Sequence, residues 1–503
     1  MENISDRHEG DLQGQLTAFT DLQPVAVAVV LDPRSAHLPG HQHTAWMLVN
    51  LLTRAVGVVS AVHLVCPSGV PLAGRTVPLA PRDASLPQAL LQGAEAIGAI
   101  PVSPAAGTQH ADITLIVGDG DRAGHPRTRF VAGYGWWGGV SSRPLPVSDT
   151  YASSALPFGP YLSACLAAAE VFLAVRLPGY HAGTATYGWD SWDQSAQPAP
   201  APGAPAGLEH LDLSGTALAG VGAVGSAWIH ALWASPGLTG EVLLSDADPK
   251  GVTLTNLNRC TLFGRRDLGR FKATSAAQTA ADTTILWRPH NTRFEQLGVT
   301  PNLLVSAVDT NRARAELQNR YAPMALSAST LDLRAETLRV ARPAIDACLR
   351  CYNPPEILTV DDELRTRTRA GGPAAVKALA DETDVSQDEV RRWLARGECG
   401  EVGTRLLESL RSHDEPPLSR FAVGFTSVMA GTLLATETAK TLTGQPMRPS
   451  SPAHTNLTFQ FLNPTATVNA TGRLARDPRC PACSPTHPAM NTWRHRAESA
   501  IHP

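Results

Sequence analysis

Three glycines near the middle of the chain have the spacing of a phosphate-binding loop. Gly220, Gly222 and Gly225, in the stretch LAGVGAVGSAWIHALW, follow the pattern G-x-G-x-x-G. Such a loop lets backbone N–H groups approach a pyrophosphate, and a helix that begins there adds the positive end of its dipole. Asp246 and Asp248 lie 26 and 28 residues beyond Gly220, where an acid that binds a ribose is expected. A tight turn can share the glycine pattern, but the acids favour a nucleotide.

The residues that follow distinguish NAD from ATP. The segment TNLNRC contains Asn256, Asn258 and Arg259, and Lys272 comes thirteen residues after Arg259. These two cations would lie beside the phosphates, and Asp309, after the apolar run LLVSAV, is placed to hold Mg²⁺. A triphosphate needs this charge neutralisation, whereas a hydride carrier does not. The pattern therefore favours ATP with Mg²⁺, and the alternative for the two cations is a solvated surface.

Four of the eight cysteines form two C-x-x-C pairs. Cys348 and Cys351 are the first and last residues of CLRC, and Cys480 and Cys483 are those of CPAC. The two pairs are separated by 128 residues. In a chain with no sign of secretion, such pairs indicate metal or redox chemistry before structural disulfides. Four thiolates at tetrahedral positions make a closed zinc site with no open position for a substrate. The spacing alone leaves two independent redox pairs as the alternative.

The glycine loop stands where a predicted strand ends and a predicted helix begins. GTALAG (215–220) indicates a buried strand, and SAWIHALW (226–233) indicates an apolar helix. Strands that alternate with helices at these lengths predict α/β architecture with parallel, doubly wound sheets. The loop would then lie at the carboxyl end of a strand, the usual place of nucleotides in such folds.

The two halves of the chain are predicted to be divergent copies of one α/β unit. The matched stretches, in order, are 44–52 with 226–233, 61–66 with 241–246, 113–123 with 303–313, and 159–172 with 424–440. Where the second copy has its glycine loop, the first has LDPRSAHLPGHQH (31–43). We therefore expect the first copy to keep the Rossmann-like fold without the nucleotide site.

Composition and charge argue against nucleic-acid binding and against a membrane span. The 503 residues are 43% hydrophobic and 17% charged with a net charge of −3, so no large basic surface for nucleic acid is expected. No signal peptide is evident, and the most apolar segment, 161–177, carries Glu170 and Arg176, which indicates a buried helix and no membrane span. We expect a cytoplasmic protein.

The Pro- and Ala-rich run SAQPAPAPGAPAG (195–207) has little to bury and indicates a semi-stiff linker. It separates a predicted inactive domain, 1–194, from a predicted active domain, 208–484, and a tail, 485–503. Residues 352–420 are predicted to be a small helical insertion or crossover region.

Over residues 208–484 these motifs resemble the ThiF/MoeB superfamily, which includes the activating enzymes of ubiquitin-like proteins. The matching pieces, in family order, are GVGAVGS, DAD, TNLNR, GRFKA, AVDTNRAR and the two C-x-x-C pairs. The resemblance implies two adenylation-type domains, the first degenerate, and adenylation of the C-terminal glycine of a small β-grasp protein with ATP and Mg²⁺. The acids stand two residues farther from Asn256 than usual, and Cys260, which we expect to be structural, replaces a glutamine.

The resemblance also implies roles by position. Gly220, Gly222 and Gly225 approach the phosphates, Asp246 or Asp248 holds the ribose, Asn256, Arg259 and Lys272 contact phosphates, Asp309 binds Mg²⁺ or orders the carboxylate, and Cys348, Cys351, Cys480 and Cys483 hold structural zinc. Cys399, in ARGECGEVG, stands where the family carries the thiol that accepts the activated acyl group. The alternative is a cysteine with no catalytic duty.

A fused pair with the inactive copy first resembles the activating enzymes of bacterial ubiquitin-like conjugation operons, several of which serve in antiphage defence. The implied partners are a ubiquitin-like protein that ends in glycine and a conjugating enzyme. Two chains could also form a homodimer, although a fused pair has less need of one. The alternatives are a sulfur-carrier-protein adenylyltransferase, a catalytically silent binding scaffold and, least favoured, an NAD-dependent oxidoreductase.

Overall fold

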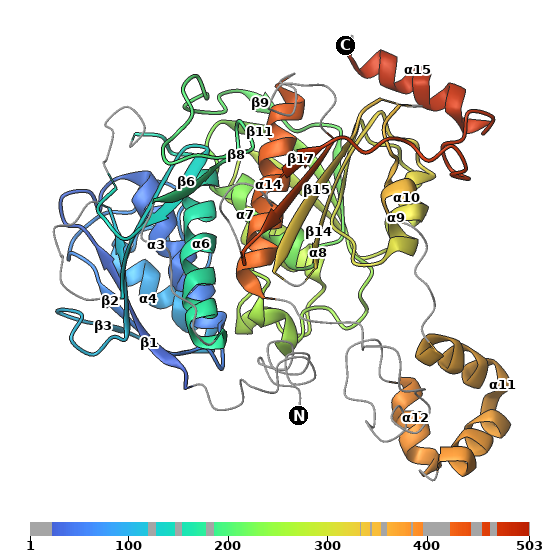
Figure 1. The fold of residues 1–503 in the computed structure, drawn as a ribbon, viewed down its shortest axis with the longest axis horizontal. Coiled ribbons are helices and arrows are strands. Elements are labelled where there is room, and N and C mark those ends of the chain that lie inside the picture. Colours follow the sequence, from blue (N-terminus) through green and yellow to red (C-terminus); the bar gives the residue numbers. More distant parts are fainter. Residues whose placement is uncertain are drawn as a thin grey trace. The chain divides into compact units, whose positions relative to one another are not determined.

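The computed structural model describes eleven stretches of the chain. They are 23–118, 127–145, 153–177, 186–331, 333–342, 345–353, 360–383, 386–395, 423–443, 455–462 and 470–501. By their contacts the residues divide into two units, Met1–Asn353 with Arg420–Pro503, and Pro354–Ser419. The first unit holds two sheets, and the second is helical (Figure 1).

The first sheet has the strand order β3-β2-β1-β4-β5-β6-β7-β8. Its strands are β1 (Val25–Leu31), β2 (Val59–Val65), β3 (Val102–Pro104), β4 (Ile113–Val117), β5 (Thr128–Tyr134), β6 (Trp137–Ser141), β7 (Tyr187–Asp190) and β8 (Ser195–Ala196). The pairs from β3 to β5 are parallel, and the pairs from β5 to β8 are antiparallel. Strand β1, with the sequence VAVAVVL, is β-branched and largely buried, as expected for the centre of a parallel sheet.

The second sheet has the order β12-β11-β10-β13-β14-β15-β16-β17, with β9 beside β11. Its strands are β9 (Leu211–Asp212), β10 (Thr216–Ala219), β11 (Leu238–Ser245), β12 (Ile285–His290), β13 (Leu303–Ser306), β14 (Met324–Leu331), β15 (Arg334–Val340), β16 (Asn456–Gln460) and β17 (Ala470–Gly472). The pairs from β12 to β14 are parallel, and the pairs from β14 to β17 are antiparallel.

Eight strands of the second sheet therefore repeat the topology of the first, and β9 is an addition beside β11. Each has a central first strand, two parallel neighbours on one side, and an antiparallel meander at the far end. In each, a long helix precedes the seventh strand of that order, α6 (Phe158–Arg176) before β7 and α14 (Gly424–Leu442) before β16. The predicted α/β class with two doubly wound units is confirmed.

Buried helices join the two sheets. Helices α3 (Pro39–Arg54) and α6 of the first half contact each other, and α14 contacts both α6 and α7 (Ala223–Ala234) (Figure 1). The Phe172 ring of α6 meets Phe425 of α14 edge-on at 5.5 Å. Helix α6 is long and apolar enough to cross a membrane, but 89% of its most apolar window is buried inside the protein. Its hydrophobicity is that of a core helix.

The stretch 195–207, which composition predicts to be a linker, is packed against the first half. Ala201 is fully buried, and its N–H donates to the Asp190 carboxylate at 2.8 Å. The Trp136 indole donates to the carbonyl of Pro205 at 2.7 Å. Small side chains and free carbonyls thus give this stretch contacts that its low hydrophobicity does not indicate.

The described part of the helical unit contains α11 (Val360–Thr383) and α12 (Gln387–Ala395). Gly372, at φ +60°, and Pro373 interrupt α11, because neither supports a continuous helix. A small apolar core holds the two helices together, formed by Leu364, Val376, Leu379, Ala380 and Val390. Cys399 lies outside the described residues.

Candidate functional site

The glycine loop follows the central strand of the second sheet. Strand β10 runs parallel to β11 and β13, so Ala219, Ser245 and Ser306 end at the same edge. Strand order reverses at β10, which makes this edge a topological switch point. Asp246 and Asp248 follow β11, and Asp309 follows β13. The fold therefore brings the predicted glycines and acids to one edge, as the sequence predicts.

Two of the glycines are required by the backbone itself. Gly220 has φ +92°, and a Cβ there would lie 2.7 Å from the carbonyl oxygen of Ala307. A Cβ on Gly225 would lie 2.0 Å from the carbonyl oxygen of Gly220. Both contacts are too short for any side chain, so these glycines allow the strand, loop and helix to pack closely.

Gly222 differs, because its missing side chain leaves open space. It is the N-cap of α7 and has no side-chain capping bond. Among the described residues, nothing lies within 4 Å of a Cβ built on it, and its φ of −80° would accept any residue. Open space therefore lies beside the N-cap of α7, and the first N–H groups of a helix have no partner within it, which fits a phosphate.

A chain of contacts joins this loop to the acids and to Lys272. The N–H of Val221 donates to Asp246 Oδ2 at 2.8 Å, and the N–H of Asp248 donates to Asp246 Oδ1 at 3.1 Å. Lys272, the first residue of α8 (Lys272–Thr279), donates from Nζ to Asp248 Oδ2 at 2.5 Å. Asp246 therefore holds the loop, and Asp248 holds the lysine.

The charges of this group reinforce one another. Burial acts to raise the pKa of Asp248, but the hydrogen bond and charge of Lys272 outweigh it and bring that pKa below its usual value. Burial acts to lower the pKa of Lys272, yet the charges of Asp246 and Asp248 raise it overall. Both groups are therefore ionised at neutral pH, and Lys272 keeps a positive charge beside the loop.

The asparagine-rich segment forms a loop with its own hydrogen bonds. It contains a short 3-10 helix, η2 (Leu254–Asn258), and Asn256 Oδ1 accepts from the N–H of Thr253 at 2.9 Å. Arg259 Nη1 donates to Asn258 Oδ1 at 2.8 Å and to the carbonyl of Thr255 at 3.0 Å. Asn258 is 1% exposed, and its Nδ2 has no partner among the described residues. A buried amide N–H group of this kind is a candidate donor to a ligand.

Asp309 is exposed at the end of β13, just before α9 (Asn311–Gln318). Thr310 caps that helix by accepting from the N–H of Ala313 at 3.2 Å. The capping bond fixes the backbone on which Asp309 stands. A carboxylate that is accessible at the same sheet edge as the glycine loop is suited to a divalent cation.

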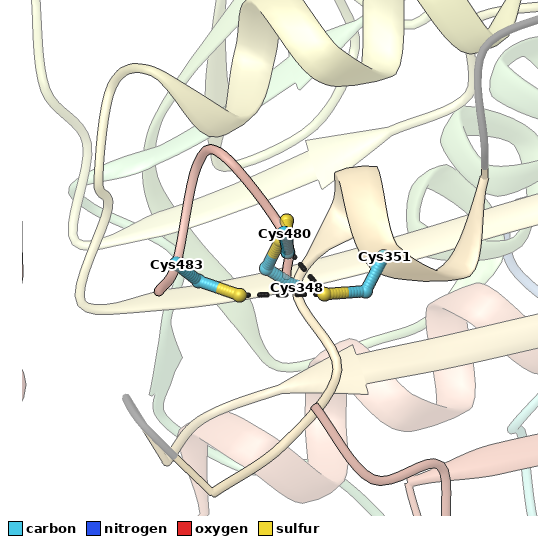
Figure 2. A group of neighbouring side chains, drawn as sticks. All are labelled: Cys348, Cys351, Cys480 and Cys483. Atoms are coloured by element: carbon cyan, nitrogen blue, oxygen red, sulfur yellow. Dashed lines mark hydrogen bonds between the residues drawn. The ribbon is translucent and has the colours of Figure 1, made fainter. Parts of the chain in front are cut away.

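The two C-x-x-C pairs meet in a second cluster (Figure 2). Cys348 Sγ lies 3.6 Å from Cys351 Sγ and 3.7 Å from Cys480 Sγ, and Cys351 Sγ lies 3.3 Å from Cys483 Sγ. Four sulfurs bound to one zinc at about 2.3 Å would lie about 3.8 Å apart. The cluster fits a closed tetrahedral zinc site, so the pairs are not independent.

The cysteine cluster ties the end of the chain to the second sheet. Hydrogen bonds among the thiols lower the pKa of Cys351 and raise the pKa values of Cys348 and Cys483, and each thiol must lose its proton to bind zinc. Nearby, Tyr321 donates to the carbonyl of Ala482 at 2.9 Å, and Trp493 of α15 (Ala489–Ile501) donates to that of Ala322. These contacts favour a structural role for the four-cysteine cluster.

The chain belongs to the ThiF family, whose model matches residues 195–482, which are 288 of the 503 residues. Membership implies ATP use and the adenylating chemistry of the ThiF/MoeB type, in which the enzyme acts on a partner protein such as a small carrier. A relative of the whole chain is the uncharacterized protein y4jF of Sinorhizobium fredii (strain NBRC 101917 / NGR234). The two sequences are 27% identical over an alignment of 509 positions. The alignment covers 90% of this chain and 88% of that protein.

Two solved structures of E. coli MccB are distantly similar. One contains MccA-N7isoASN and the other SeMet MccA. Each has a TM-score of 0.37 with this chain and covers 55% of it. The first is 15% identical and is covered over 69% of its length, and the second is 14% identical and covered over 68%.

Some residues beside the site carry no motif that indicates a role. Asn50 and Arg54 of α3, in the first half, make hydrogen bonds to η2 and to the loop that follows it. The one sequence signal is that Asn50 and Arg54 stand four apart in the mainly apolar second half of the helix, which places them on one face.

Proposed function

We propose that this protein activates the C-terminal glycine of a ubiquitin-like protein by adenylation, passes it to an enzyme cysteine as a thioester, and then delivers it to a conjugating enzyme. ATP and Mg²⁺ are the co-substrates, and zinc is structural. The bacterial ubiquitin-like conjugation operons, with their antiphage role, are the proposed setting, and the cytoplasm the proposed location.

One observation carries the proposal. At a single edge of the second sheet, open space in front of α7 adjoins a fixed chain of Val221, Asp246, Asp248 and Lys272. A helix N-terminus and a cation suit phosphates, and carboxylates suit ribose hydroxyls and Mg²⁺. A nicotinamide cofactor would have no use for Lys272, Arg259 and Asp309 together.

In the proposed first step, a carboxylate oxygen of the partner attacks the α-phosphorus of ATP, and pyrophosphate leaves. Gly220, Gly222 and Gly225 let the backbone approach the phosphates, and Asp246 or Asp248 holds the ribose. Asn256, Arg259 and Lys272 stabilise the negative charge that develops on the transferred group. Asp309 holds Mg²⁺ or orders the carboxylate.

In the second step, a thiolate attacks the acyl carbon of the mixed anhydride, a thioester forms and AMP leaves. Cys399 is the proposed nucleophile. Among the other cysteines outside the metal cluster, Cys165 and Cys260 are fully buried, and burial raises the pKa of the half-buried Cys66 to about 12. These three thiols are poorly suited to attack an acyl-adenylate.

The test uses the full chain, Mg²⁺, labelled pyrophosphate and ATP with candidate β-grasp proteins that end in glycine. We expect ATP–pyrophosphate exchange that depends on the terminal glycine, and a thiol-sensitive adduct that Cys399→Ala loses while exchange continues. A thiocarboxylate product would instead assign the chain to sulfur-carrier activation. Absence of exchange with every glycine-ending partner would indicate a silent scaffold.

A further inference from the structure

We propose that Asn50 and Arg54, on helix α3 of the first half, are positioning residues for the loop of the second half that carries Asn256, Asn258 and Arg259. The inference rests on the proposed function, because it assigns the first half a part in shaping the adenylation site. It gives a reason why the chain keeps the α/β unit of the first half, which lacks a glycine loop of its own.

Arg54 spans the base of that loop. Its guanidinium donates from Nη1 to the carbonyl of Leu257 at 2.6 Å and from Nη2 to that of Phe263 at 2.8 Å. Asn50 accepts from Arg54 Nε at 2.7 Å and donates to the carbonyl of Thr261 at 3.0 Å. The bonded carbonyls lie on both sides of Asn258 and Arg259 in sequence, so the loop is held at both ends.

A second contact links α3 to the helix behind the glycine loop. The Trp46 indole donates to His230 Nε2 at 3.2 Å, so that nitrogen is an acceptor. Burial lowers the pKa of His230 to about 3, so the ring is neutral and carries its proton on Nδ1. That N–H faces Thr261 Oγ1 at 3.2 Å. Helix α3 therefore contacts both α7 and the asparagine loop.

The site of Arg54 leaves no substitute for its hydrogen bonds. Arg54 and Asn50 are both 0% exposed, so removing the guanidinium takes away the donor to carbonyls that lie in the protein interior. Burial lowers the pKa of Arg54 to about 10, which keeps the side chain charged at neutral pH. The loop also meets α14, where a Cβ on Gly424 would lie 3.2 Å from the carbonyl oxygen of Asn258. Two helices therefore contact the loop.

The experiment compares Arg54→Met, Arg54→Lys and Asn50→Asp in the full chain. Asn50→Asp preserves shape but replaces the donor to Thr261 with an oxygen. The matched control is Arg129→Met, which removes a partly buried arginine that pairs with Glu170 inside the first half at 2.8 Å. The readouts are the Kd for ATP with Mg²⁺, the KM and kcat of pyrophosphate exchange, and amide hydrogen exchange over residues 255–263.

We expect Arg54→Met to weaken ATP binding on the order of tenfold to a hundredfold, because a small displacement of the loop misplaces its side chains. Amide exchange over 255–263 should accelerate, Arg54→Lys should recover part of both effects, and Arg129→Met should show neither. If Arg54→Met does not fold, Asn50→Asp should show the same effects at smaller size.

An Arg54→Met or Asn50→Asp variant with the Kd and local amide exchange of the Arg129→Met control would overturn the positioning role. A wild-type chain that fails to bind ATP would instead overturn the proposed function. In that case the amide exchange over 255–263 still decides whether α3 orders the loop.

Discussion

The two halves share a topology but differ at the turn that follows the central strand. In the second half, Gly222 leaves open space in front of α7. In the first half, Asp32 pairs with Arg34 at 3.1 Å, and α3 begins with Pro39, which has no N–H to offer an anion. His41 fills the same turn, with Nδ1 3.1 Å from the carbonyl of Ser35 and Nε2 3.4 Å from Tyr134 Oη.

This difference shows how little of the fold a nucleotide site requires. The strand order and buried helices of the first half are intact, although a proline, an ion pair and a histidine stand where the second half has its loop. A core is kept by apolar side chains spread over many positions, whereas an anion site depends on a few N–H groups and an empty space.

The largest effect is expected from Asp309→Ala. Loss of the carboxylate that holds Mg²⁺ or orders the substrate should reduce pyrophosphate exchange on the order of 10³-fold. The control is Asp119→Ala, since Asp119 has the matching place in ITLIVGDGDRA of the first half; its structural position lies outside the described residues. Equal loss in both variants, or exchange retained in Asp309→Ala, would contradict the assignment.

Gly222→Ala separates binding from stability. The added methyl enters open space, so we expect an unchanged Tm with ATP affinity reduced on the order of 10²-fold. Gly40→Ala, four residues before the matching helix stretch of the first half, should do the opposite, because its Cβ would lie 2.7 Å from the carbonyl oxygen of Gly133. Calorimetry of unfolding and ATP titration measure both. Normal ATP binding by Gly222→Ala would show that the space is not the phosphate site.

Zinc should stabilise the second half. In Cys348→Ser, zinc content and the free energy of unfolding should fall together, with a loss of at least about 2 kcal/mol, because metal loss is among the large destabilising changes. Metal analysis and urea unfolding before and after chelation measure this. Cys165→Ser changes a buried cysteine of the first half and should leave zinc content alone. Unchanged zinc content in Cys348→Ser would contradict the four-cysteine zinc site.

A loss of stability at acid pH is expected from buried histidines. Burial lowers the pKa of His41 and His43 to about 4 and that of His230 to about 3, against 6.5 when unfolded. The unfolded chain therefore binds more protons below pH 6.5, and stability should fall between pH 6.5 and 4 by roughly 1.4 kcal/mol per unit for each histidine. Urea unfolding across this range should show a shallower slope for His41→Gln. An unchanged slope would exclude His41 as a contributor.

The sequence predicts that the glycine loop and the acids follow their strands at one sheet edge, because their spacing is local and strand–loop–helix units fix it. It cannot predict that Arg54 bonds to Leu257, 203 residues away, because only the packing of the two halves brings them together. The sequence also predicts a linker at 195–207, where the structure shows packed residues. Buried alanines and hydrogen-bonded carbonyls produce no hydrophobic pattern that would indicate this packing. Only the family resemblance predicts that Cys348 and Cys480 lie together. In the structure, the antiparallel pairing of β15 with β16 brings the later part of the chain back toward Cys348.

The most direct test is calorimetric titration of the full chain with ATP and Mg²⁺, with NAD⁺ as the competing ligand. We predict one ATP site per chain, no displacement by NAD⁺, and ATP affinity reduced on the order of 10²-fold in Gly222→Ala but unchanged in Gly40→Ala. Two sites per chain, none, or a site that NAD⁺ occupies would contradict the account.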